Sequence, residues 1–246
     1  MFFRPAILFL TASASLAVAQ EPAPAQPAAA VKPSVEKLDE TRYQIGRIIF
    51  DQKTREIRFP AKVNMVEGLL EFLLVHENGK LHESLLMTDV SPTQLNLAFT
   101  LLRYPPSREL YPLPNDKGGA SNEYPDVPAE VKAAARIAID VEWKDGEKTR
   151  RLPANDLVQH TVKSTSMPAG PWLYGGSEFN DGKFAPEASG DIIAIFTTNS
   201  ALIVYPGKDD DNDEVWTPYP KRVPAAGTEV TVIITPFSNS KPLPKP

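Results

Sequence analysis

Two mainly apolar runs on either side of Asn78-Gly79 form the clearest local pattern along the chain. The first runs from Leu69 to His76 and the second from Leu81 to Thr88. An Asn-Gly dipeptide between such runs is a strong signal for a type I′ hairpin turn, because both central residues of that turn need a positive φ. Since both runs carry apolar residues on both faces, they belong in the centre of a sheet. The pattern therefore predicts a central antiparallel hairpin.

A helix is predicted directly after this hairpin. Ser91 fits the N-cap, Pro92 fits the first helical position, and Gln94 completes a capping box. The buried face is marked by apolar residues at i, i+3, i+4 and i+7, which are Leu95, Ala98, Phe99 and Leu102. Two prolines at residues 105–106 then end the helix.

The same order of elements is expected again further along the chain. Strand-like residues 135–143 and 148–152 flank a Lys-Asp-Gly turn, and a short helix is predicted at 153–160. Further strands are expected at residues 47–50, 56–63, 191–197, 201–205 and 229–234. The sum is an α+β fold with a mostly antiparallel sheet and hairpin-then-helix units. A further hypothesis is two similar halves, joined by the Pro- and Gly-rich stretch 105–130.

The first residues have the three parts of a secretory signal peptide. Arg4 supplies the positive charge, residues 6–16 supply an apolar core, and Ala17-Val18-Ala19 supplies a small-x-small cleavage pattern. The apolar core is shorter than the roughly 20 residues that a membrane anchor needs. We therefore expect export to the periplasm or the extracellular space.

The composition of the chain predicts a signal peptide, a linker, one folded domain and a tail. Cleavage would remove the signal peptide, residues 1–19. The mature chain would then begin with an Ala/Pro-rich linker at 20–37, followed by a single domain at 38–237 and a disordered tail at 238–246. No later segment is long and apolar enough to span a bilayer.

Composition narrows the chemistry of the exported product. The 246 residues include no cysteine, which excludes disulfides, cysteine-ligated metals and a lipid carried on cysteine, so the protein is not a lipoprotein. A formal net charge of −5 argues against a nucleic-acid partner, because phosphate binding needs a basic face. A protein or carbohydrate of the cell envelope is the partner class that we expect instead.

The predicted hairpin places polar residues where a central strand would be apolar. Strand alternation puts Glu71, His82 and Ser84 on one face and Glu83 on the other. A carboxylate, an imidazole and a hydroxyl on one face suit general acid–base or hydrolytic chemistry. The alternative is a hydrogen-bond network that fixes the strand register. No nucleophile-elbow sequence accompanies Ser84.

An acidic run at residues 209–214 is the candidate metal site. Asp209, Asp211 and Asp213 supply carboxylates on alternate residues, which suits a hard cation such as Ca²⁺. The EF-hand pattern fails, because Glu214 replaces the loop glycine and Pro220 the closing glutamate. The alternative is a solvated acidic loop, and we expect no other cofactor.

Four aromatic residues in Pro- and Gly-rich segments have two interpretations. They suit a stacking platform for a sugar or peptide, or they fill the ends of a sheet core, and we favour the core. These residues are Trp172, Tyr174, Trp216 and Tyr219.

The hairpin and helix also resemble a known family. The shared features are a Glu on the first strand, a Lys-x-His-Glu-Ser motif opening the second and an alanine in the capped helix, here Glu71, Lys80, His82, Glu83, Ser84 and Ala98. Residues 176–179 and 224–230 are similar to that family's second half. Over roughly residues 40–236 the sequence resembles the YdjY-domain family of exported bacterial proteins, which implies an exported domain of the same kind.

Two functional hypotheses follow. The first is an exported, non-catalytic binding or structural module, because no recognisable catalytic motif is present. The second is a hydrolase or metal-dependent enzyme that uses the face formed by Glu71, His82 and Ser84.

Overall fold

Strands dominate the computed structural model, which describes residues 34–117, 121–180 and 182–238. Strands account for 37% of the residues and helices for 14%. All the described residues belong to one compact unit, Pro33–Pro246. The signal peptide and nearly all of the predicted linker and tail lie outside the described residues.

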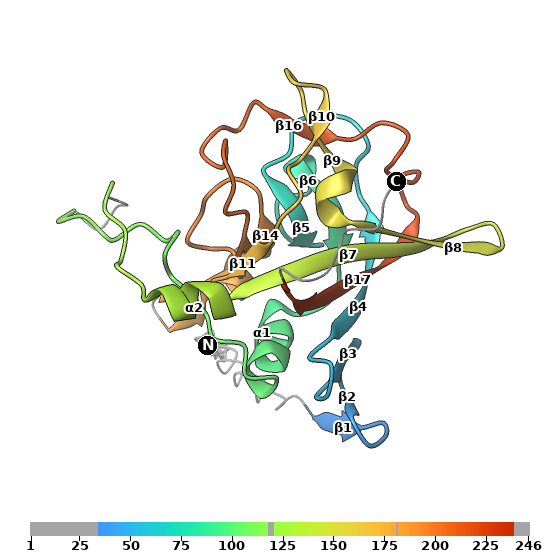
Figure 1. Cartoon of the computed structure of the whole chain (residues 1–246), viewed down its shortest axis with the longest axis horizontal. Coiled ribbons are helices and arrows are strands. Elements are labelled where there is room, and N and C mark those ends of the chain that lie inside the picture. Colours follow the sequence, from blue (N-terminus) through green and yellow to red (C-terminus); the bar gives the residue numbers. More distant parts are fainter. Residues whose placement is uncertain (1–33, 118–120, 181, 239–246) are drawn as a thin grey trace, which may run out of the picture. The chain divides into compact units, whose positions relative to one another are not determined.

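Eight strands close into a mixed barrel (Figure 1). Around the barrel the order is β4-β17-β7-β11-β15-β14-β5-β6, and β6 pairs with β4 to close it. The bounds of these strands are β4 (Ile57–Val63), β5 (Phe72–His76), β6 (Ser84–Thr88), β7 (Arg136–Asp145), β11 (Trp172–Tyr174), β14 (Asp191–Ala194), β15 (Ile203–Val204) and β17 (Glu229–Pro236). The pairs β5–β6 and β14–β15 are parallel, and the other pairs in the barrel are antiparallel.

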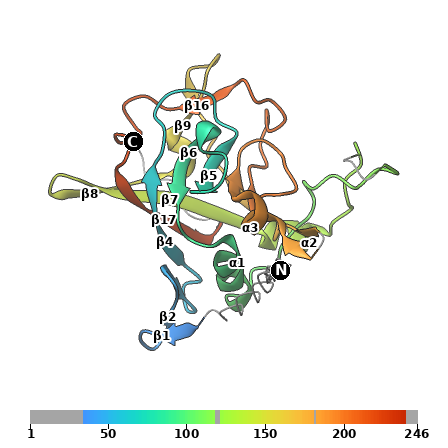
Figure 2. The same ribbon diagram turned by 180° about the vertical axis from the view of Figure 1, so that it is seen from behind.

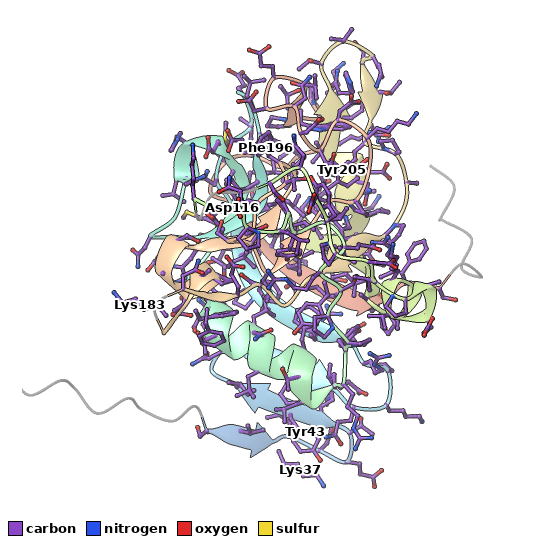
Figure 3. The ribbon with its side chains drawn as sticks, turned by 90° about the vertical axis from the view of Figure 1, so that its left-hand side faces the viewer. Lys37, Tyr43, Asp116, Lys183, Phe196 and Tyr205 are labelled. Atoms are coloured by element: carbon purple, nitrogen blue, oxygen red, sulfur yellow. The ribbon has the colours of Figure 1, made fainter. Side chains whose placement is uncertain are left out.

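Additional strands extend this sheet or lie beside it. The sheet continues from β4 through β3 (Ile48–Asp51) and β2 (Arg42–Ile45) to β1 (Val35–Lys37), and β8 (Lys148–Pro153) pairs with β7. The small sheets contain β9 (Val158–His160), β10 (Thr165–Ser166) and β16 (Trp216–Pro218), and β12 (Phe179–Asn180) with β13 (Lys183–Phe184). β1 falls within the range that the sequence assigned to the linker. Figure 3 shows Lys37 of β1 beside Tyr43 of β2, with the lysine Nζ 6.0 Å from the ring centroid.

The helices are few and short among the described residues. They are α1 (Pro92–Leu101), α2 (Ala129–Ala134) and α3 (Ala185–Ser189), together with the 3₁₀ turns η1 (Leu81–Glu83) and η2 (Ala154–Leu157). Figure 2 shows α1 and α3 on the same side of the sheet, and the two helices are in contact. None of the described helices is long and apolar enough to cross a membrane.

Alternation along the strands builds the core. Phe59, Val232 and Val141 stand opposite one another on β4, β17 and β7, and all three are buried. A second apolar cluster lies on the opposite face of the wall, where Leu173 pairs with Val204 and packs with Tyr111. The barrel wall is therefore covered on both faces in this region.

The predicted α+β class with hairpin-then-helix units is wrong. β5 and β6 are parallel neighbours, joined by residues 77–83 with η1 among them, so they do not form an antiparallel hairpin. Gly79 does not have a positive φ and does not form the expected turn. The apolar pattern identified both strands, but strands distant in sequence, β14 and β4, fix their direction and register.

Most of the other predicted elements are present in the structure, but one predicted helix is not. The strands expected near residues 47–50, 56–63, 135–143 and 229–234 are confirmed. α1 is confirmed, and the Ser91 hydroxyl accepts a bond from the Gln94 N–H at 3.3 Å. The helix predicted at 153–160 is wrong, because η2 ends after one turn and β9 follows.

Candidate functional site

Ser84 is the first residue of β6 and is fully buried. Its hydroxyl donates to the Leu86 carbonyl at 2.7 Å. This bond satisfies the hydroxyl within its own strand, as expected for a buried polar group. The hydroxyl therefore lies in the barrel wall and does not face solvent.

His82 lies on η1 and points away from the barrel. Its side chain is 80% exposed, and Nε2 is 3.6 Å from a carboxylate oxygen of Glu83. Within the described residues, no hydrogen bond or ion pair joins His82 to Glu71 or Ser84. The three residues expected on one strand face therefore do not form a nucleophile–base arrangement, which needs hydrogen-bond contact.

Glu71 and Glu83 do lie together. The Glu71 N–H donates to the Glu83 carbonyl at 3.0 Å, and Lys80 Nζ lies 3.6 Å from Glu83 Oε1. Burial raises the pKa of the Glu71 carboxyl, and the nearby charges of Glu83 and Asp213 add to this rise, whereas Lys80 opposes it. The structure thus forms a carboxyl pair from two of the four candidate residues.

The acidic run does not converge on one point. Asp209 Oδ2 accepts from Lys163 Nζ at 3.0 Å and lies 3.4 Å from His160 Nε2. The hydrogen bond from Lys163 holds the pKa of Asp209 below its usual value. Asp211 and Asp213 are exposed. Across the described ranges, no group of three or more His, Asp or Glu side chains is positioned to hold a metal ion.

A groove of about 420 Å³ lies on the outer face of the barrel. Its lining comes mainly from β4, β17, β7, β8 and the residues that follow β5 and β6. Charged side chains of both signs dominate this lining, with hydroxyl groups and one partly buried methionine between them. The lining residues are Arg47, Pro60, Ala61, Lys62, Glu77, Met87, Thr88, Asp89, Glu142, Trp143, Lys144, Thr149, Glu229, Val230 and Thr231.

Some of these charges are already paired within the chain. Arg47 binds Asp89 through Nη1, at 2.7 Å from Oδ1, and Arg58 reaches Glu142 at 2.7 Å. Lys62, Glu77 and Glu229 are exposed and take part in no ion pair within the described part of the chain. The groove therefore offers charged groups that a ligand could pair.

The sequence matches the model of the YdjY domain over residues 48–235. The chain belongs to the YdjY domain family. No curated protein and no solved structure gives a significant match. The match includes the carboxyl pair, the acidic run and most of the groove.

Two polar clusters of this YdjY domain were not predicted. Asp191 is 2% exposed and accepts from the Ser200 hydroxyl, which also lies 2.8 Å from the Thr198 hydroxyl. The only sequence signal was a single aspartate opening an apolar run. His160 is 5% exposed, and its ring meets that of Trp216 edge-on at 5.2 Å.

The aromatic residues of the YdjY domain are mainly core residues. Trp172, Tyr174 and Trp216 are buried, and Trp172 packs against Tyr205 with ring centroids 5.6 Å apart. The Tyr219 ring is covered by the Arg222 guanidinium at 4.1 Å. Trp172, Tyr174 and Trp216 thus agree with the preferred prediction that these aromatic residues fill the core, whereas Tyr219 is only half-buried.

Proposed function

We propose that the protein is an exported binding module without catalytic activity, and that the groove on β4, β17 and β7 is its binding surface. The observation that carries the proposal is the set of exposed, unpaired charges in that groove, on Lys62, Glu77 and Glu229. Its volume of about 420 Å³ lies within the range of ligand sites, roughly 300–1,000 Å³. The separation of His82 from Ser84 supports a role without catalysis.

Export is supported by the charge, apolar core and cleavage pattern of residues 1–19. Expression of the full chain in a bacterium, followed by fractionation and intact-mass measurement, tests it. The expected species lies outside the cytoplasm and begins at Gln20. A protein that retains Met1 would contradict the export proposal.

Binding is tested by amide chemical shifts of the ¹⁵N-labelled mature protein. Probes are a peptide set, a set of cell-wall oligosaccharides and a set of single amino acids. The expected result is a group of shifted amides around Lys62, Lys144 and Glu229 with at least one probe. Saturable shifts that concentrate elsewhere, or no saturable shifts with any set, would contradict the assignment of the groove.

A second candidate function is a hydrolase that uses the carboxyl pair of Glu71 and Glu83. The raised pKa of Glu71 favours it, because a general acid must hold its proton more tightly than an ordinary carboxyl does. Hydrolysis of chromogenic ester, glycoside and peptide substrates would be measured for wild type and for Glu71→Gln. Turnover that this substitution abolishes would establish the second candidate and overturn the first.

A further inference from the structure

A row of alternating charges crosses the groove. Cross-strand pairing places Lys62 of β4 opposite Glu229 of β17. The register between β17 and β7, continued by one residue, places Glu229 across from Lys144. All three residues are exposed and each is next to a buried residue of its strand, namely Ala61, Val230 or Trp143, so their side chains lie on the outer face. Across the sheet the order of charges is therefore positive, negative, positive, on Lys62, Glu229 and Lys144.

These three charges do not neutralise one another. No ion pair joins them within the described ranges, although Arg58 and Glu142 on the same face pair at 2.7 Å. Lys144 Nζ donates only to a hydroxyl, that of Thr149, at 2.7 Å. Lys62 and Glu229 stand directly opposite each other, yet their charged groups remain apart. Both lysines and the glutamate are therefore available to a ligand.

The lining disfavours other ligand classes. A phosphate-rich ligand would be repelled by Glu77, Glu229 and the other carboxylates of the groove. Sugar rings are commonly bound by stacking on an exposed aromatic face, but the groove's aromatic residue, Trp143, is 6% exposed. A bare metal ion is disfavoured because no suitable group of ligands occurs in the described residues.

We propose that the groove binds an extended peptide that presents an acidic, a basic and an acidic side chain in that order on one face. The proposal rests on the groove being a binding surface and adds the class of ligand. Neighbouring strands lie about 4.8 Å apart, so the two lysines are separated by about 10 Å across the sheet. Every second side chain of an extended peptide repeats at roughly 6.6 Å. Long Glu and Lys side chains are flexible enough to accommodate the difference between the strand spacing of about 4.8 Å and the peptide side-chain spacing of roughly 6.6 Å. Met87, opposite Lys62, adds an adaptable apolar contact.

The test compares two peptides of reversed charge order, acetyl-Glu-Ala-Lys-Ala-Glu-amide and acetyl-Lys-Ala-Glu-Ala-Lys-amide. Exposed ion pairs contribute about 0.2–1 kcal/mol each, so three pairs predict a preference of about tenfold for the first peptide. Affinity is measured by titrating ¹⁵N-labelled protein at low salt, and added salt should weaken the binding.

Variants of the row make the test specific. The reversed row, Lys62→Glu/Glu229→Lys/Lys144→Glu, should invert the preference between the two peptides. If this variant folds poorly, the single substitutions Lys62→Gln and Lys144→Gln serve instead. Each should lower the affinity for the first peptide by about threefold. Lys148→Glu is the matched control, because Lys148 is exposed on β8 and does not line the groove. It should leave the preference unchanged.

The outcomes separate this inference from the proposed function. Equal binding of the two peptides, or a preference that the reversed row leaves unchanged, overturns the peptide assignment. If neither peptide shifts the amide signals of the groove but an oligosaccharide or an amino acid does, the peptide assignment fails and the proposed binding function stands. If no probe shifts the amide signals of the groove, the peptide assignment and the proposed binding function both fail.

Discussion

Tyr111 shows how one side chain in a loop can hold the barrel wall together. Its hydroxyl donates to the Ala201 carbonyl at 2.9 Å, two residues before β15 begins. The Arg108 guanidinium lies 4.6 Å from the ring centroid on one side. On another side the ring lies directly against the backbone of Gly175, and burial raises the pKa of the phenol. The loop is fixed to the wall at this residue.

Gly175→Ala should therefore destabilise the protein by about 1–3 kcal/mol, the usual cost of overpacking a core. An added Cβ would lie 1.8 Å from Tyr111 Oη, so the ring must move and lose its bond to Ala201. Urea unfolding measures the change. Gly170→Ala is the control, since a Cβ there meets nothing within 4 Å. Equal midpoints for the two variants would contradict this packing.

The candidate residues show what single positions in a sequence can and cannot predict. Ser91 was predicted correctly because an N-cap bond closes within three residues. Ser84 and His82 were placed on one face by assuming that Leu81 to Thr88 is continuous strand, whereas η1 occupies residues 81–83. The turn rotates His82 into solvent. Their residue types were visible in the sequence, but this local break in the strand was not.

At the scale of elements, a carboxylate of one helix caps another helix. Glu187 of α3 accepts from the Thr93 N–H and the Ser91 hydroxyl of α1, both at 2.8 Å. Partial burial of Glu187 acts to raise its pKa, but these hydrogen bonds outweigh it and lower the pKa overall. The sequence predicted the cap from Ser91 but not its partner almost a hundred residues away.

Glu187→Gln should lower stability by about 1 kcal/mol at pH 7, a typical value for a helix N-cap. Because the pKa is lower in the folded protein, the charged carboxylate stabilises the fold above the unfolded value, near 4.5, and this gain is lost as the pH falls through the folded value. The difference from wild type should therefore shrink below pH 4.5. Thermal melts between pH 3 and 7 measure it.

Glu147→Gln, in the exposed turn between β7 and β8, is the control and should change little at any pH. A Glu187→Gln effect that is constant from pH 3 to 7 would show that the charge of Glu187 is not what stabilises α1.

The connection between β5 and β6 approaches the backbone before β14 closely at two glycines, Gly79 and Gly190. A Cβ on Gly190 would lie 2.7 Å from the Gly79 Cα, and the Gly190 φ is +82°. The Gly190 carbonyl also accepts from the His76 N–H at 2.8 Å. Asn78-Gly79 is thus important for a different reason from the one the sequence indicated: its glycine allows close contact with the backbone before β14.

Gly190→Ala should therefore cost more stability than Gly182→Ala. Both glycines have positive φ, at +82° and +75°, so backbone strain of about 1–3 kcal/mol acts in each variant. Only Gly190 adds a clash, because a Cβ on Gly182 meets nothing within 4 Å. Urea midpoints compare the two variants. A smaller loss for Gly190→Ala would contradict the close approach.

At the scale of the whole molecule, the barrel interleaves strands from both ends of the chain. β4 pairs with β17 over six residue pairs, and β5 pairs with β14. The sequence predicted most of these strands individually, because alternation and apolar runs are local signals. It also suggested two similar halves, because local patterns do not show which strands pair. In the structure β4, β5 and β6 lie between strands of the second half, so neither half contains a closed barrel.

We therefore expect neither residues 34–104 nor residues 105–238 to fold alone, because each fragment would expose barrel strands without their partners. Amide spectra of each fragment should be poorly dispersed, and mixing them should restore dispersed signals. In the intact protein, unfolding followed by tryptophan fluorescence and by circular dichroism should coincide, as in a two-state transition. This comparison is informative because the fluorophores Trp143, Trp172 and Trp216 all lie in the second half. A fragment that folds alone, or two separate transitions, would mean that the halves are independent units and that the pairs β4–β17 and β5–β14 do not couple them.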